Sequence, residues 1–183
     1  MRPNLFLARV LYGNSNNIVN FASRVINQRN LQSMNNQFSP KISEVLIYSK
    51  EEALRLHNEC VAPEHLLLGL IRDGEGKAIQ ILRLLNLDFR SVKLRAEQSI
   101  QGSAMQEMPD ADHEIILNEK ASKIMRLCLL EARMLKAQVA DTEHILLAIM
   151  KEKDNNACRI LEENSIHYTD ILNLLTQKAE KSD

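Results

Sequence analysis

The chain has 183 residues, of which 45% are hydrophobic and 4% aromatic, with no tryptophan, five glycines and a formal net charge of −1. A core that must be built from Leu, Ile, Val, Ala and Met favours close-packed helices over sheets. The charge lacks the basic excess that nucleic-acid binding requires, and no apolar run reaches the length of a membrane-spanning helix.

Residues 1–33 differ in composition from the rest of the chain. They hold four arginines and no acidic residue, which with the total of −1 leaves −5 for residues 34–183. This Asn-rich and Ser-rich stretch has a transit-peptide-like composition. We expect residues 1–35 to be a leader, either an upstream extension without a fold of its own or a targeting or tethering arm.

A first helix is predicted over about residues 39–56. Its apolar residues follow the spacing of three, four and seven that places side chains on one helical face. Ser39 supplies a capping hydroxyl, and Pro40 suits the first helical position. After a short loop at 58–62, a second helix begins at Pro63.

The second helix is apolar on nearly all sides, so we expect it to form the buried centre of the unit. The Asp-Gly-Glu-Gly stretch at 73–76 ends it as a helix-breaking turn. Third and fourth helices are predicted over about 77–85 and 88–99.

The same pattern occurs a second time further along the chain. Residues 62–71 (APEHLLLGLI) return as residues 141–150 (DTEHILLAIM), and the flanking apolar positions keep the same register. The second set of helices is therefore expected at about 118–135, 142–152, 154–163 and 167–180, with Thr142 as an N-cap. The predicted fold is all-α: two tandem four-helix repeats, residues 36–101 and 116–180, joined by a linker at 102–115 and related by a pseudo-twofold axis.

The duplicated Glu-His-Leu/Ile-Leu-Leu motif, the helix ending at 51–56 and the stretch 71–76 (IRDGEG) resemble the N-terminal domain of Clp/Hsp100 AAA+ unfoldases, the ClpC type above all. The resemblance covers roughly residues 36–180. It implies a monomeric docking domain that receives substrate and adaptor proteins and presents them to an AAA+ ATPase ring coupled to the Clp peptidase. The alternative is a stand-alone accessory protein that binds and regulates a Clp protease or unfoldase complex.

Two glutamates, Glu64 and Glu143, lie at the start of the repeated helices. A carboxylate there interacts favourably with the helix dipole, by a few tenths to about 1 kcal/mol, which is a structural reason for each. A carboxylate also binds a guanidinium, and helix N-terminal N–H groups and hydroxyls bind phosphate. The resemblance implies two phosphoarginine-docking pockets: Glu64 with Ser39 and backbone amides near Phe38, and Glu143 with Asn118. The family commonly has threonine at both capping positions, so an amide replaces a hydroxyl at Asn118.

Nucleotide and metal sites are not expected. The Gly-Lys pair at 76–77 lacks the earlier glycine of a phosphate loop, where Ile71 stands, and the following Ser or Thr, where Ala78 stands. The zinc motif HExxH is absent, because neither Glu-His pair is followed by a second histidine at the required spacing. The two motif histidines are expected to hydrogen-bond a neighbouring helix.

The three cysteines, Cys60, Cys128 and Cys158, form no CxxC pair and are expected to be reduced thiols of a cytoplasmic protein. They pair with no base at a catalytic spacing, so we predict a binding domain without a cofactor rather than an enzyme. A helix-turn-helix DNA reader is a further possibility for a helical fold, but the acidic charge of residues 34–183 argues against it.

Overall fold

The computed structural model describes residues 37–100 and 115–180, which form eight helices and two short strands. These elements are α4 (Pro40–Arg55), β1 (Cys60–Val61), α5 (Pro63–Asp73), α6 (Lys77–Leu84), α7 (Phe89–Ile100), β2 (Ile116–Leu117), α8 (Glu119–Met134), α9 (Thr142–Lys151), α10 (Asn156–Glu163) and α11 (Tyr168–Glu180). The helices agree closely with the predicted ones at both ends. The expected leader at 1–35 and the expected linker at 102–115, apart from residue 115, lie outside the described residues.

Helices α4 and α8, the first helix of each repeat, begin at the capping residues that the sequence predicts. The Ser39 hydroxyl accepts a hydrogen bond from the Ile42 N–H at 3.3 Å, and Pro40 occupies the first helical position. In the second repeat the Asn118 Oδ1 accepts from the Ala121 N–H at 2.8 Å. Each cap satisfies one of the N–H groups that a helix start leaves without an intrahelical partner.

The prediction that Thr142 caps α9 is wrong. Thr142 is the first helical residue, and Asp141 is the cap, with its carboxylate accepting from the Thr142 N–H at 2.8 Å. A carboxylate is a strong acceptor at a helix N-terminus, so it displaces the threonine from that role. The predicted helix-breaking turn after α5 is confirmed, because Gly74 ends the helix in the left-handed conformation at φ 72°.

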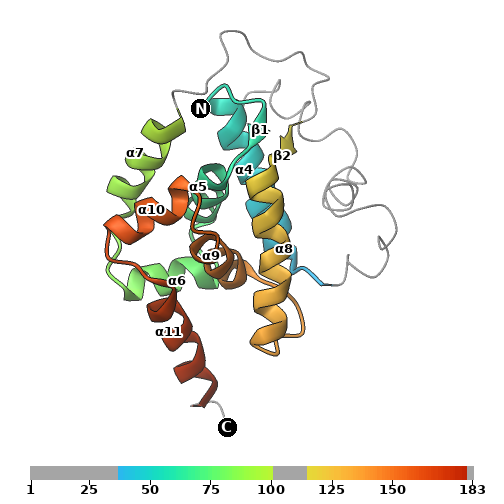
Figure 1. Ribbon diagram of the computed structural model, residues 1–183, viewed down its shortest axis with the longest axis vertical. Helices are drawn as coiled ribbons and strands as arrows, with labels where there is room; N and C mark the ends of the chain where they lie inside the picture. The colour runs from blue at the N-terminus through green and yellow to red at the C-terminus, as the bar shows by residue number, and fades with distance from the viewer. Residues whose placement is uncertain (1–36, 101–114, 181–183) are drawn as a thin grey trace.

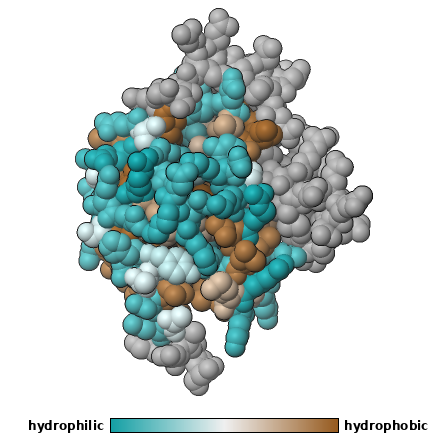
Figure 2. Space-filling view, viewed as in Figure 1, coloured by the Kyte–Doolittle hydropathy of each residue, from teal (hydrophilic) through white to brown (hydrophobic). Residues whose placement is uncertain are grey.

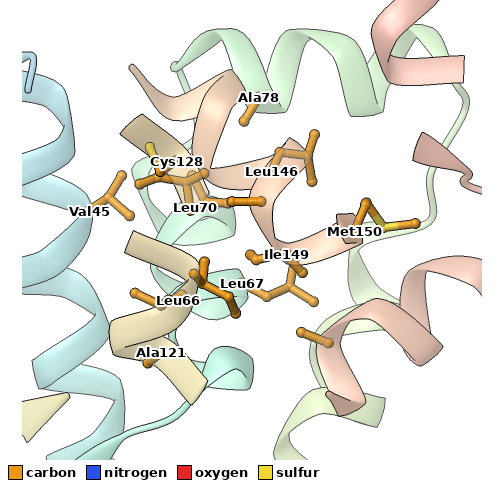
Figure 3. Packing of buried hydrophobic residues seen from close by; sticks show 14 of the residues in the cluster. Val45, Leu66, Leu67, Leu70, Ala78, Ala121, Cys128, Leu146, Ile149 and Met150 are labelled. Carbon is orange, nitrogen blue, oxygen red and sulfur yellow. The ribbon is translucent and has the colours of Figure 1, made fainter. Parts of the chain in front are cut away.

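Helices α5 and α9 lie at the centre of the molecule, as predicted for the apolar second helix of each repeat (Figure 1). Leu66, Leu67 and Leu70 of α5 meet Leu146 and Ile149 of α9 in the interior (Figure 3), and all five are fully buried. Burial of one such side chain stabilises the fold by about 1.5–3 kcal/mol. The two motif helices therefore form one shared core.

The two repeats are interleaved around this core. Helix α6 packs on α9 and helix α10 packs on α5, so the third helix of each repeat covers the second helix of the other. The first helices lie outside the pair, with α4 against α5 and α8 against α9 (Figure 1). Gly69 lets α5 approach α4 closely, since a Cβ there would lie 2.3 Å from the Ser49 Oγ. This reciprocal packing confirms the all-α, pseudo-twofold arrangement.

The surface is mostly hydrophilic in the view of Figure 2, with a hydrophobic area over α8, the helix on which Leu130 and Met134 are exposed. None of the helices in the described part of the chain is both long and apolar enough to cross a membrane.

Candidate functional site

Two short parallel pairings connect the repeats crosswise. Strand β1 pairs with β2, with Cys60 opposite Ile116, and the Asn118 N–H continues the ladder by donating to the Val61 carbonyl at 2.9 Å. Asn118 therefore lies beside the start of α5, the helix that carries Glu64. Neither strand is predicted by the helical pattern of the sequence, because each is too short to show a pattern of its own.

The matching pairing holds the start of the first repeat against the second. Phe38 forms a parallel bridge with Ala140, and the Ser39 N–H donates to the Ala140 carbonyl at 2.8 Å. The Ser39 hydroxyl also donates to the Asp141 carboxylate at 2.8 Å. Ser39 and Phe38 thus lie at the start of α9, the helix that carries Glu143.

The predicted partners of the two glutamates are therefore wrong, although the same residues meet. Ser39 and Phe38 do not join Glu64, and Asn118 does not join Glu143; each belongs with the other glutamate. The physical reason is the exchange of segments: the residues before each first helix form backbone hydrogen bonds with the loop of the other repeat. We call the two places the Glu64 site and the Glu143 site.

The Glu64 site is an open pocket of about 580 Å³. Its lining residues are Asn58, Glu59, Cys60, Ala62, Pro63, Glu64, His65, Ser99, Ile100, Asn118, Lys120, Asp154, Asn155, Asn156 and Arg159. Glu64 is only 7% exposed, and within residues 37–100 and 115–180 nothing gives its carboxylate a hydrogen bond or an ion pair. The Glu64 oxygens are not sealed from solvent, so the carboxylate faces the open pocket, where the cationic group of a ligand can bind it.

Cationic and donor groups line the same pocket as that carboxylate. Lys120 and Arg159 line the pocket, and Lys120 also forms an ion pair with Asp154 at 2.9 Å. Asn118 uses its Oδ1 for capping, which leaves the side-chain NH₂ as its donor. Ala62 precedes α5 and has no capping side chain; the His65 Nδ1 accepts from the Ala62 N–H, and Pro63 at the first helical position has no N–H. The pocket therefore offers one acceptor for a cation and several donors for an anion.

The Glu143 site is occupied by a side chain of the protein itself. The Lys77 ammonium lies 3.1 Å from the Glu143 Oε1, while the Glu143 Oε2 is buried without a hydrogen bond from the described residues. The Thr142 hydroxyl accepts from the Ala78 N–H at 3.2 Å, which holds the start of α6 over the start of α9. Glu143 itself is 4% exposed.

The motif histidines stabilise the helix starts. The His65 Nδ1 accepts from the Ala62 N–H at 2.9 Å, and its Nε2 lies 2.9 Å from the Asn58 Oδ1. The His144 Nδ1 accepts from the Asp141 N–H in the same way, at 2.9 Å. The expectation that they bond a neighbouring helix is wrong, because each reaches back to the cap residue of its own helix.

These contacts require neutral imidazoles. Burial lowers the pKa of His65 to about 4 and also lowers the pKa of His144. With Nδ1 as acceptor, the proton of His65 lies on Nε2, where it can be donated to Asn58. Among the described residues, no cluster of three or more His, Cys, Asp or Glu side chains is placed to hold a metal ion.

The cysteines of the described chain are free thiols, and Cys128 and Cys158 are buried. Cys60 is half-buried and lines the Glu64 site. Burial raises the pKa of its thiol, and the nearby Glu59 carboxylate raises it further. A raised pKa disfavours the thiolate, which is the nucleophilic form.

Four residues of these sites are not predicted by the sequence: Lys120 and Arg159 in the Glu64 site, and Lys77 and Asp141 in the Glu143 site. Lys120, Arg159 and Lys77 each come from the repeat that does not contain the glutamate of their site. Asp141 lies in the loop just before the helix that carries Glu143. The internal repeat offers a sequence signal for one of them, because Lys120 is the counterpart of Lys41 when the two repeats are aligned.

A family model and the most similar curated proteins point to the same protein family. The family model described as the Clp repeat (R) N-terminal domain matches residues 37–164. The chain is 37% identical over 125 residues to the negative regulator of genetic competence ClpC/MecB of Bacillus subtilis, covering 68% of this chain and 15% of that protein. It is 30% identical over 149 residues to the ATP-dependent Clp protease ATP-binding subunit ClpA homolog of Porphyra purpurea, covering 79% of this chain and 18% of that protein.

The fold comparison agrees. The crystal structure of the Hsp104 N-terminal domain from Candida albicans superposes with a TM-score of 0.62 at 16% identity, covering 76% of this chain and 89% of that one. The N-terminal domain of the chaperone ClpD from Arabidopsis thaliana gives a TM-score of 0.58 at 16% identity, covering 79% of this chain and 95% of that one. Since the chain spans less than a fifth of the curated relatives named above, they contain much sequence that has no counterpart here.

Proposed function

Since the chain belongs to the Clp repeat N-terminal domain family of Clp/Hsp100 chaperones, we propose that it is a docking domain for substrate and adaptor proteins. It delivers marked proteins to an AAA+ ring and, through that ring, to the Clp peptidase. The mark that fits its open pocket is phosphoarginine.

This proposal rests on the Glu64 carboxylate, which has no hydrogen-bond or ion-pair partner among the described residues. It lies in a pocket rich in hydrogen-bond donors. Phosphoarginine joins a guanidinium group to a phosphate through one nitrogen, so it needs an acceptor and a set of donors close to one another. Glu64 receives the guanidinium in a charge-assisted contact, and Lys120, Arg159 and the Asn118 amide receive the phosphate. The N-terminus of α5 adds its favourable field for an anion.

The role proposed is binding without turnover. The glycines that resemble a phosphate loop have structural roles: Gly74 closes α5, and a Cβ on Gly76 would lie 2.7 Å from the Thr142 Oγ1. We accordingly propose no nucleotide, metal or other cofactor for this segment, which acts as a monomer. A cytoplasmic setting, inferred from unpaired cysteines, belongs to the same proposal.

A capture experiment tests this function. The full chain is immobilised and offered one unfolded protein in two forms, phosphorylated on arginine and unphosphorylated. Glu64→Gln keeps the size of the side chain but removes its charge, and Glu143→Gln makes the same change at the equivalent position of the other repeat. Loss of one charge-assisted contact, about 1.5–3 kcal/mol, corresponds to a decrease of about 10- to 150-fold in affinity.

We expect retention of the phosphorylated form by the wild-type chain and by Glu143→Gln, and its loss in Glu64→Gln. Equal retention of both forms by Glu143→Gln, which keeps only the Glu64 site, would refute phosphoarginine recognition. Retention of the phosphorylated form by Glu64→Gln at the wild-type level would refute the assignment of the pocket.

A further inference from the structure

The two glutamate sites differ at the position where an anion would bind. At the Glu64 site the residue before the helix is Ala62, which leaves the helix start without a side-chain cap. At the Glu143 site the same position is Asp141, whose carboxylate receives the Ser39 hydroxyl at 2.8 Å and the Thr142 N–H at 2.8 Å. The Ser39 hydroxyl and the Thr142 N–H are therefore already bound to a carboxylate and are not available to a phosphate.

The Glu143 carboxylate already holds a cation. Lys77 reaches it from α6 of the other repeat, 3.1 Å from Oε1, although the Lys77 side chain is 61% exposed. At the Glu64 site the counterpart of Lys77 is Asn156, which lines the pocket without bonding Glu64. One oxygen of Glu143, Oε2, stays buried without a hydrogen bond from any residue that the structure describes. A single ammonium thus satisfies only half of this acceptor.

The balance of acidic and basic side chains around the two sites also disfavours an anion at the Glu143 site. Around the Glu143 site the basic side chains are Lys41 and Lys77, and the acidic ones are Glu44, Asp73, Glu75, Asp141 and Glu143. Around the Glu64 site the basic side chains are Lys120, Lys123 and Arg159, and the acidic ones are Glu59, Glu64, Glu152 and Asp154. Charges nearly balance at the Glu64 site, whereas carboxylates clearly outnumber cations at the Glu143 site.

We propose that the Glu143 site is a receptor for an unmodified arginine side chain of a docking protein, which displaces Lys77 from Glu143. A guanidinium presents two parallel N–H donors and satisfies both carboxylate oxygens, including the buried Oε2, which an ammonium does not. A phosphate is rejected because it would bring about −1.5 to −2 charges against Asp141. This inference rests on the proposed docking function and assigns the two repeats different ligands.

Lys77 then acts as a built-in competitor. Its side chain is 61% exposed, so the ammonium returns to water when it leaves Glu143. An incoming arginine replaces it without leaving Glu143 unpaired and buried, which would be costly. Lys77 thus excludes weakly binding ligands from Glu143, whereas a guanidinium displaces Lys77.

The test is a heteronuclear NMR titration of the full, isotopically labelled chain with three short peptides of one sequence. They carry arginine, phosphoarginine or neutral citrulline at the central position. Amide signals of α9 near Glu143 and of α5 near Glu64 report the two sites separately in the same sample. The variants are Lys77→Ala, which removes the competitor, and Glu143→Gln, which removes the receptor charge; their spectra also report whether the fold is intact.

The proposal predicts that the arginine peptide shifts the α9 signals and that citrulline does not. Lys77→Ala is expected to tighten that binding by about fivefold because the competing ammonium is removed, and Glu143→Gln to weaken it at least tenfold. The phosphoarginine peptide is expected to shift the α5 signals instead.

Two results would overturn the inference while leaving the proposed function intact. One is the absence of α9 shifts with the arginine peptide in both the wild-type chain and Lys77→Ala. The other is a response of α9 to phosphoarginine as strong as that of α5. Failure of phosphoarginine to shift the α5 signals, with arginine still acting on α9, would instead refute the proposed function of the Glu64 site.

Discussion

Replacement of His65 by glutamine is expected to remove much of the acid sensitivity of the fold. His65 is 1% exposed, and burial lowers its pKa from the ordinary 6.5 to about 4. Between these two values the unfolded chain binds a proton that the folded chain does not. Stability is therefore fully present above about pH 6.5 and is lost as the pH falls toward 4.

The size of the effect follows from these two pKa values. One pKa unit corresponds to about 1.4 kcal/mol, so the complete loss is about 3 kcal/mol, and the part between pH 7 and pH 5 is about 2 kcal/mol. For a chain of this size each kcal/mol shifts Tm by about 2–4 °C, which gives a decrease of about 4–8 °C. The lowered pKa of His144 adds a contribution of the same sign.

The assay is urea unfolding of the wild-type chain and His65→Gln at pH 7 and pH 5. Glutamine is suited to the comparison because its side-chain oxygen can still accept from the Ala62 N–H, as in a capping box, without titrating. The difference between the two pH values, rather than the absolute stability, is the readout, and it is expected to be about 2 kcal/mol smaller in the variant. An equal loss of stability in both proteins would refute the claim that His65 is buried in neutral form.

Three further substitutions test the packing and the polar contacts. Gly69→Ala is expected to destabilise the fold by about 1–3 kcal/mol because the new Cβ would lie 2.3 Å from the Ser49 Oγ; thermal melts check this, and an unchanged Tm would contradict the close helix approach. Tyr168→Phe should cost about 1–2 kcal/mol in urea unfolding because it removes the 2.7 Å hydrogen bond to the buried Glu131 carboxylate; a neutral effect would contradict that bond. Asn155→Ala is expected to lose about 1 kcal/mol or more, since Asn155 caps α10 through the Cys158 N–H; hydrogen exchange at the start of α10 should increase, and unchanged protection would refute the cap.

The helical part of the fold could be predicted because local signals agree with the long-range packing. Ser39, Pro40 and Gly74 mark helix ends through their own backbone preferences. Gly69 and the apolar residues around it are spaced for a helix buried on nearly all sides. The internal repeat then carries each assignment to the second half.

The site could be predicted only as a set of residues, because its geometry depends on connections that leave no local signal. Cys60 pairs with Ile116, which lies in the other repeat, through strands too short to show a pattern. The cap at Asp141 could not be distinguished from its neighbour, because Thr142 satisfies the same sequence rule. Which hydroxyl or amide meets which glutamate is thus a property of the packed pair of repeats.

The proposed docking function depends on recognition of phosphoarginine by one open pocket, the Glu64 site. The measurement is calorimetric titration of free phosphoarginine into the full chain, with inorganic phosphate as the control and with arginine as the separate probe of the Glu143 site. Phosphoarginine is expected to bind at a single site that is lost in Glu64→Gln and retained in Glu143→Gln. Absence of binding to the wild-type chain, or binding that Glu64→Gln leaves unchanged, would contradict it.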